Sequence, residues 1–151
     1  MTDALERIGA DKNPKDLLST RGRALFELGR YEDALADFDR VIAIDPTYDH
    51  VLNNRGVTNL ALGEYERGVS DLTAAIAWKP GDALAYRNRS GAYYDLRKLD
   101  LAIADANIAI ARDSEDPLGY ILRGNARDRK GDFDDALSDY GIALKLSPQH
   151  P

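Results

Sequence analysis

Apolar side chains recur at helical spacing in short stretches that end at turn residues. The first stretch covers residues 17–28, has apolar positions three or four apart, and stops at Gly29. The second covers residues 34–42 and stops before Pro46. Residues spaced in this way share one face of a helix, glycine favours the left-handed end of a helix, and proline cannot continue one. The pattern therefore predicts a hairpin of two amphipathic helices.

Capping residues mark where these helices begin. Asn13 stands directly before Pro14, and Asp16 follows in the first turn. Asp116 and Pro117 repeat the cap and the proline before a later stretch. Asparagine and aspartate accept hydrogen bonds from the first amides of a helix, proline is tolerated in the first turn, and an acid is favoured near the positive end. We expect the helix boundaries to hold within about two residues.

The hairpin pattern repeats with a period of 34 residues. Four blocks of equal length cover residues 15–48, 49–82, 83–116 and 117–150, and residues 1–14 precede them as a short capping helix or the relic of an earlier unit. An arginine stands at position 7 of every block and an aspartate at position 23: Arg21, Arg55, Arg89 and Arg123, with Asp37, Asp71, Asp105 and Asp139. A fixed period without insertions is typical of stacked helical repeats, in which each unit buries its apolar face on its neighbours. The sequence predicts an all-α helical repeat array.

The small, aromatic and proline positions of the blocks resemble the tetratricopeptide repeat family over residues 15–150. The first block carries Gly22, Tyr31, Ala34, Phe38 and Pro46, and the fourth carries Gly124, Phe133, Ala136, Tyr140, Ala143 and Pro148. The resemblance implies one domain over residues 1–151, an α-solenoid in which helix-turn-helix hairpins form a right-handed superhelix. The third block of this chain differs most from the family pattern, since its motif positions hold Ser90, Arg97, Leu99, Ala106 and Ser114. We expect a normal third hairpin with a less filled core and the fastest amide exchange.

The recurring arginines and aspartates allow two interpretations. They are either a charged ligand track or pairs that hold helices together within or across units. We favour pairing, because identical residues at identical repeat positions usually serve the repeat itself. If Arg55 and Asp71 are partners, Arg55→Ala costs more stability than replacing both, since the single change strands a charge.

Composition and charge disfavour several other functions. Lys+Arg 20 against Asp+Glu 26 gives a net charge of -6, which argues against nucleic acid or an anionic membrane as the partner. Cysteine is absent and no apolar run approaches the ~20 residues of a membrane span. The expected location is the cytoplasm, with the periplasm as the alternative. The acidic run 131–140 lacks the glycine and glutamate of a calcium loop, and only two histidines are available for catalysis, so we expect no metal, no cofactor and no enzyme activity.

The family resemblance implies that the first helices of successive units line a concave groove, which holds an extended peptide or a helix of a partner protein. Asparagine amides in such a groove can bind a peptide backbone, although capping or solvating a helix is the alternative role. Of the family's carboxylate clamp for chaperone tails, only Asn54 matches, so that ligand is disfavoured. Asp128 and Arg129 also fall at groove positions. The candidate binding residues are Arg23, Asn53, Asn54, Val57, Leu60, Arg87, Asn88, Tyr94, Ile121 and Asn125.

The end of the array suggests a second possible function. Leu137, Leu144 and Leu146 stand where a following helix would lie. Either the array is a monomer with a moderately polar end, or two chains bury these ends together as a homo-dimer. The function predicted first is a protein-interaction scaffold that binds a partner segment in the groove. The alternative is a self-associating structural subunit without a peptide ligand of its own.

Overall fold

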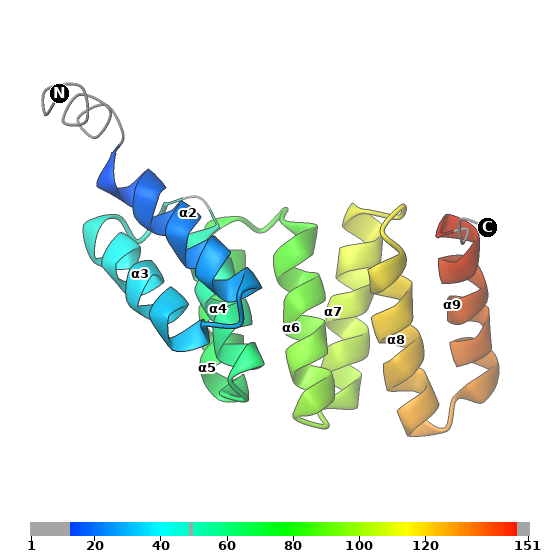
Figure 1. Ribbon diagram of the computed structural model, residues 1–151. Coiled ribbons are helices and arrows are strands. Elements are labelled where there is room, and N and C mark those ends of the chain that lie inside the picture. The colour runs from blue at the N-terminus through cyan, green and yellow to red at the C-terminus, as the bar shows by residue number, and fades with distance from the viewer. Residues whose placement is uncertain (1–12, 49, 148–151) are drawn as a thin grey trace, which may run out of the picture. The chain divides into compact units, whose positions relative to one another are not determined.

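The computed structural model describes residues 13–48 and 50–147, which form helices and no strand (Figure 1). This confirms the predicted all-α fold of helix-turn-helix pairs. None of the described helices has the length and apolarity needed to cross a lipid bilayer. The expected cap over residues 1–14 falls almost wholly outside the described residues, as do Asp49, Pro148 and His150. The helices are α2 Pro14–Glu27, α3 Tyr31–Ile44, α4 Val51–Ala61, α5 Tyr65–Trp78, α6 Ala83–Asp95, α7 Leu99–Arg112, α8 Pro117–Lys130 and α9 Phe133–Leu146.

The predicted helix starts are confirmed by their capping hydrogen bonds. The amide of Lys15 donates to Oδ1 of Asn13 over 3.2 Å, and α2 begins at Pro14. The amide of Leu118 donates to Oδ1 of Asp116 over 3.0 Å, and α8 begins at Pro117. These short polar side chains satisfy amides that have no partner within the helix. Local sequence therefore sets where these two helices begin.

The helices form two compact units, one ending at Glu64 and the other beginning at Tyr65. In the first unit, α3 packs against both α2 and α4 around Phe38, which is fully buried. A Cβ atom added to Gly22 would lie 2.7 Å from the Phe38 ring. A glycine on α2 thus makes room for the aromatic side chain of α3, and this close approach holds the hairpin together.

In the second unit, α5 packs on α6, α6 pairs with α7, α7 packs on α8, and α8 pairs with α9. In the hairpin of the fourth repeat, a glycine again makes room for an aromatic ring, as in the first unit. A Cβ on Gly124 would lie 2.7 Å from the Tyr140 ring. The third repeat has Ser90 and Ala106 at these two positions, both fully buried. The Ser90 hydroxyl donates to the carbonyl of Ala102 over 2.8 Å. The third hairpin therefore forms from a different pair of side chains.

The turn between α6 and α7 holds Arg97 in the left-handed region, with φ of 57°. The equivalent residues of the other repeats are Gly29, Gly63 and Gly131, which all have positive φ. A non-glycine residue costs roughly 1–2 kcal/mol in this conformation, against roughly 0.5–1 kcal/mol for the greater chain entropy of glycine. We predict that Arg97→Gly raises the free energy of unfolding by about 0.5–1 kcal/mol in urea denaturation. Arg97→Ala keeps the strain, so an equal gain from alanine would contradict the explanation.

Candidate functional site

Three of the recurring arginines form ion pairs with the aspartate of their own repeat. Arg89 donates to both carboxylate oxygens of Asp105 over 2.7 and 3.0 Å, and Arg21 does the same to Asp37 over 2.6 Å. Arg123 and Asp139 form the same pair in the fourth repeat. The aspartates are buried, and hydrogen bonding with Asp105 raises the pKa of Arg89 above its ordinary value. In these repeats the predicted pairing is confirmed.

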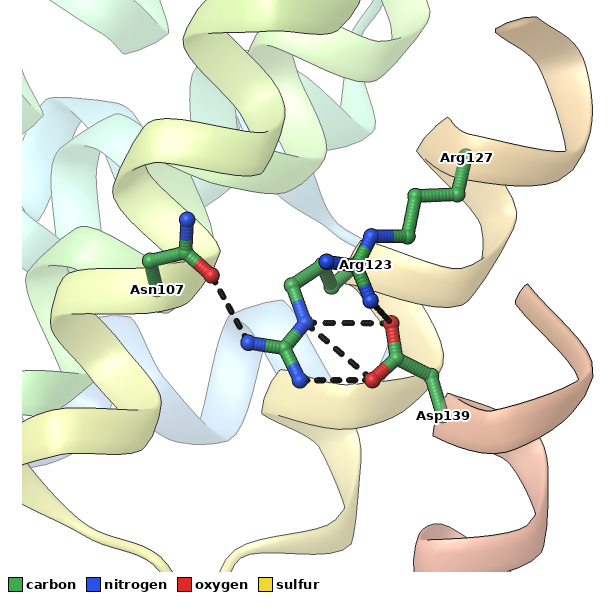
Figure 2. Close-up of polar contacts among 4 residues, drawn as sticks. All are labelled: Asn107, Arg123, Arg127 and Asp139. Atoms are coloured by element: carbon green, nitrogen blue, oxygen red, sulfur yellow. Dashed lines mark hydrogen bonds and ion pairs between the residues drawn. The ribbon is translucent and has the colours of Figure 1, made fainter. Parts of the chain in front are cut away.

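The recurring arginines of the second, third and fourth repeats also contact the preceding repeat through Nη1. Figure 2 shows Arg123 of α8 between Asp139 on α9 and Asn107 on α7, whose Oδ1 accepts from Nη1 over 2.7 Å. Arg89 reaches Thr73 over 3.0 Å in this way, and Arg55 reaches Asp39 over 2.7 Å. Each acceptor lies 16 residues before its arginine. These arginines link consecutive repeats within each unit, which favours a structural role over a ligand track.

The predicted groove residues of the first unit differ in exposure. Arg23 on α2 is exposed, whereas Asn54, Val57 and Leu60 on α4 are half-buried. Asn53 is only 4% exposed and offers little surface to a ligand. Among the candidates of this unit, Arg23 and Asn54 therefore present the most accessible polar groups.

In the second unit, the predicted residues lie on two helices that contact each other, α6 and α8. Arg87, Asn88 and Tyr94 come from α6, whereas Ile121 and Asn125 come from α8, and all are half-buried. Nη1 of Arg87 lies 2.7 Å from Oδ2 of Asp116, a carboxylate that also caps α8. Because its charge is already matched, Arg87 is a weaker candidate for a ligand carboxylate than the sequence indicated.

Four side chains form a polar and aromatic cluster on α6, α8 and α9, which we call the Tyr94 cluster: Tyr94, Asn125, Arg129 and Tyr140. The guanidinium of Arg129 lies over the Tyr94 ring, 4.2 Å from its centroid. Asn125 precedes Arg129 by four residues on α8, so both side chains lie on one face of that helix. The Tyr140 hydroxyl donates to Oδ1 of Asn125 over 2.9 Å. The cluster thus joins three helices of one unit.

The protonation of Tyr140 follows from its surroundings. Burial is the main cause that raises the pKa of its hydroxyl, and the negative charge of nearby Asp128 adds to the effect. The phenol therefore stays protonated at neutral pH and donates its hydrogen bond to Asn125. From the sequence, Tyr140 was expected only as a packing residue of the hairpin. Its polar role had no signal there, because the partner Asn125 does not recur in the other repeats.

Two protein-family models match the repeats of this chain. A model described as TPR repeat matches residues 22–63, and a tetratricopeptide repeat model matches residues 53–117. A comparison with curated proteins finds no match.

Several solved structures are similar to this chain. MamA, residues 41 to the end, from Desulfovibrio magneticus RS-1 is 27% identical, with a TM-score of 0.81 over 89% of this chain and 76% of that one. The second TPR of Spaghetti (RPAP3), bound to the HSP90 peptide SRMEEVD, is 32% identical, with a TM-score of 0.63 over 64% of this chain and 84% of that one. TTC0263, a thermophilic TPR protein in Thermus thermophilus, is 24% identical with a TM-score of 0.80, over 87% of this chain and 74% of that one, and shows the fold alone.

Proposed function

Because the chain belongs to the tetratricopeptide repeat family, we propose that it is a non-catalytic scaffold that binds an extended segment of a partner protein across α6 and α8. Proteins of this family generally mediate protein–protein interactions. The similar Spaghetti domain has been solved with a peptide bound, which supports a peptide as the ligand class. The observation that carries the proposal for this chain is the Tyr94 cluster, because its polar groups are oriented and partly exposed.

The Tyr94 cluster presents hydrogen-bond donors. Oδ1 of Asn125 is engaged by Tyr140, so the two N–H groups of that amide are left to face a ligand. Arg129 is exposed, and among the described residues its guanidinium contacts the Tyr94 ring rather than a carboxylate. A guanidinium held on an aromatic face has already lost part of its side-chain freedom, which lowers the cost of binding. Donors in this arrangement suit the carbonyls and a carboxylate of an extended peptide.

Apolar side chains of α8 complete the proposed site. Ile121 is half-buried and Leu118 is 46% exposed, and both are on the helix that carries Asn125 and Arg129. They offer contacts for an apolar side chain of the ligand. We therefore propose a peptide that combines an acidic group with a hydrophobic anchor. Asn88 remains a proposed contact for the rest of the segment. In the first unit, Arg23, Asn54, Val57 and Leu60 remain proposed ligand contacts of that unit itself.

Selection from a phage-displayed library of random peptides tests this proposal. We expect the selected peptides to share an acidic residue or a free C-terminal carboxylate near an apolar residue. A charged hydrogen bond contributes about 1.5–3 kcal/mol, so Arg129→Ala is expected to weaken binding of a selected peptide by about 10- to 100-fold in calorimetry. Arg40→Ala, at an exposed arginine of α3, is the matched control and is expected to leave affinity unchanged. Equal affinity of wild type and Arg129→Ala would place the site elsewhere.

A further inference from the structure

An apolar stripe runs along α9, and we define it by Phe133, Leu137, Gly141 and Leu144. The three large side chains are 61%, 67% and 65% exposed. The four residues of the stripe follow one another at spacings of four, four and three, so they share one face of the helix. Leu146, which the sequence analysis assigned to the same surface, is half-buried and lies outside the stripe. Exposed leucines in one row mark a contact surface more strongly than the same leucines scattered singly.

The equivalent face of α7 is covered by the next hairpin. Ile110, the counterpart of Leu144, lies so close to α8 that a Cβ on Gly119 would be 3.0 Å from its Cγ1. Asn107, the counterpart of Gly141, accepts the hydrogen bond of Arg123 that links the repeats. At Gly141 this acceptor is missing. The α9 stripe keeps the apolar part of a repeat contact but lacks the polar group that would hold the arginine of a following repeat.

We propose that the α9 stripe is a self-association surface, on which α9 packs antiparallel against α9 of a second copy. A Cβ on Gly141 would meet no atom within 4 Å, so the backbone there is open to a neighbour. When two such helices run antiparallel with Leu137 of each opposite Gly141 of the other, a large side chain fills the space that a glycine leaves. Rows of residues four apart interdigitate in this manner in helix pairs.

The charges beside the stripe select the antiparallel direction. Asp134 and Lys145 are both exposed and lie on the same flank of the stripe, one near each end of α9. In the antiparallel register, Asp134 of each copy lies beside Lys145 of the other, which gives two pairs of opposite charge. In a parallel pair, the two flanks would lie on opposite sides of the interface, so Asp134 and Lys145 would not meet. Charge complementarity therefore favours a second copy of this helix as the occupant.

This inference goes beyond the proposed function, because self-association through α9 needs no peptide ligand. One helix per copy buries less than the ~1,200 Å² of a standard interface, so we expect a weak dimer with a Kd on the order of 100 μM. Such a dimer would carry two Tyr94 clusters and could bind two segments of one partner with increased avidity.

Sedimentation equilibrium of the full chain from about 10 μM to about 1 mM tests the surface, since this range brackets the expected Kd. We expect wild type to dimerise and Leu137→Lys to reduce association at least about tenfold, because it places a charge in an apolar contact. Leu101→Lys, at a leucine of α7 that is 49% exposed, is the matched control and should associate as wild type. Circular dichroism confirms that each variant is folded. A wild-type monomer throughout the range, or no effect of Leu137→Lys, would overturn the proposal.

Charge reversal tests the register. Asp134→Lys and Lys145→Asp each replace two attractive contacts by two repulsive ones, so each should weaken association by about fivefold at low salt. The double variant restores opposite charges and should return association to within about twofold of wild type. A double variant as weak as the single ones would contradict the antiparallel pairing.

Discussion

Replacing Arg89 by methionine is expected to lower the free energy of unfolding by about 3 kcal/mol, because it leaves a buried carboxylate without its counter-charge. The Asp105 side chain is 6% exposed, and both of its oxygens accept from Arg89. Methionine keeps much of the volume and the flexible stem of arginine, so the loss reports mainly on the charge. Urea denaturation followed by circular dichroism measures the effect.

Two further variants separate the pair from simple packing. Replacing both residues, as Arg89→Met with Asp105→Leu, should cost less than Arg89→Met alone, because no buried charge remains. Arg89 and Asp105 occupy the repeat positions of Arg55 and Asp71, and both lie within one compact unit. Arg123→Met is the matched single change and should cost clearly less, since Arg127 still lies 2.8 Å from Asp139. Equal losses from Arg89→Met and Arg123→Met would contradict the explanation.

The sequence predicted those parts of the fold that depend on local chemistry. Asn13 and Asp116 each cap a helix through an amide two residues away, and Gly29 occupies a turn that needs positive φ. The turn glycine recurs at the same position in three of the four repeats, because each of these turns has a positive φ. The pairing of Arg89 with Asp105 was also predictable, since both residues recur at fixed positions.

The links between repeats were not predictable in the same way. Asp39, Thr73 and Asn107 accept from equivalent arginines, yet they share only an oxygen acceptor and no residue type. When equivalent positions keep the same hydrogen bond but carry different residue types, the sequence shows no repeated residue at that position. The contact between Arg87 and Asp116 likewise does not recur among the described ion pairs, so the sequence presented Arg87 as an available cation.

The Tyr94 cluster depends on side-chain directions that spacing alone does not give. Tyr94 and Asn125 were candidates because of their groove positions, but the stacking of Arg129 and the hydrogen bond from Tyr140 need the packing of α6, α8 and α9. These contacts convert a set of polar positions into a group of oriented donors. Specificity is therefore expected to depend on residues that vary between repeats, whereas the repeated ones maintain the array.

Gly124→Ala is expected to lower the free energy of unfolding by about 2 kcal/mol, although alanine favours helices over glycine by about 1 kcal/mol. The added Cβ would lie 2.7, 3.0 and 3.2 Å from three atoms of the Tyr140 ring. That ring has little freedom to move, because its hydroxyl is bonded to Asn125. The steric cost should therefore exceed the gain in helix propensity, as measured by urea denaturation.

Gly91→Ala and a change at Tyr140 provide the controls for this prediction. Gly91 also lies inside a helix, but its added Cβ would be 3.8 Å from Leu122, an ordinary contact, so Gly91→Ala should stabilise by about 0.5–1 kcal/mol. In a Tyr140→Ala background, Gly124→Ala should also become stabilising, because the obstructing ring is gone. The third repeat already has small residues at both of these positions, Ser90 and Ala106, and both are buried. If Gly124→Ala lowers the free energy of unfolding equally in both backgrounds, the two positions are not coupled. In that case, the pairing of a glycine with an aromatic ring does not set the distance between α8 and α9.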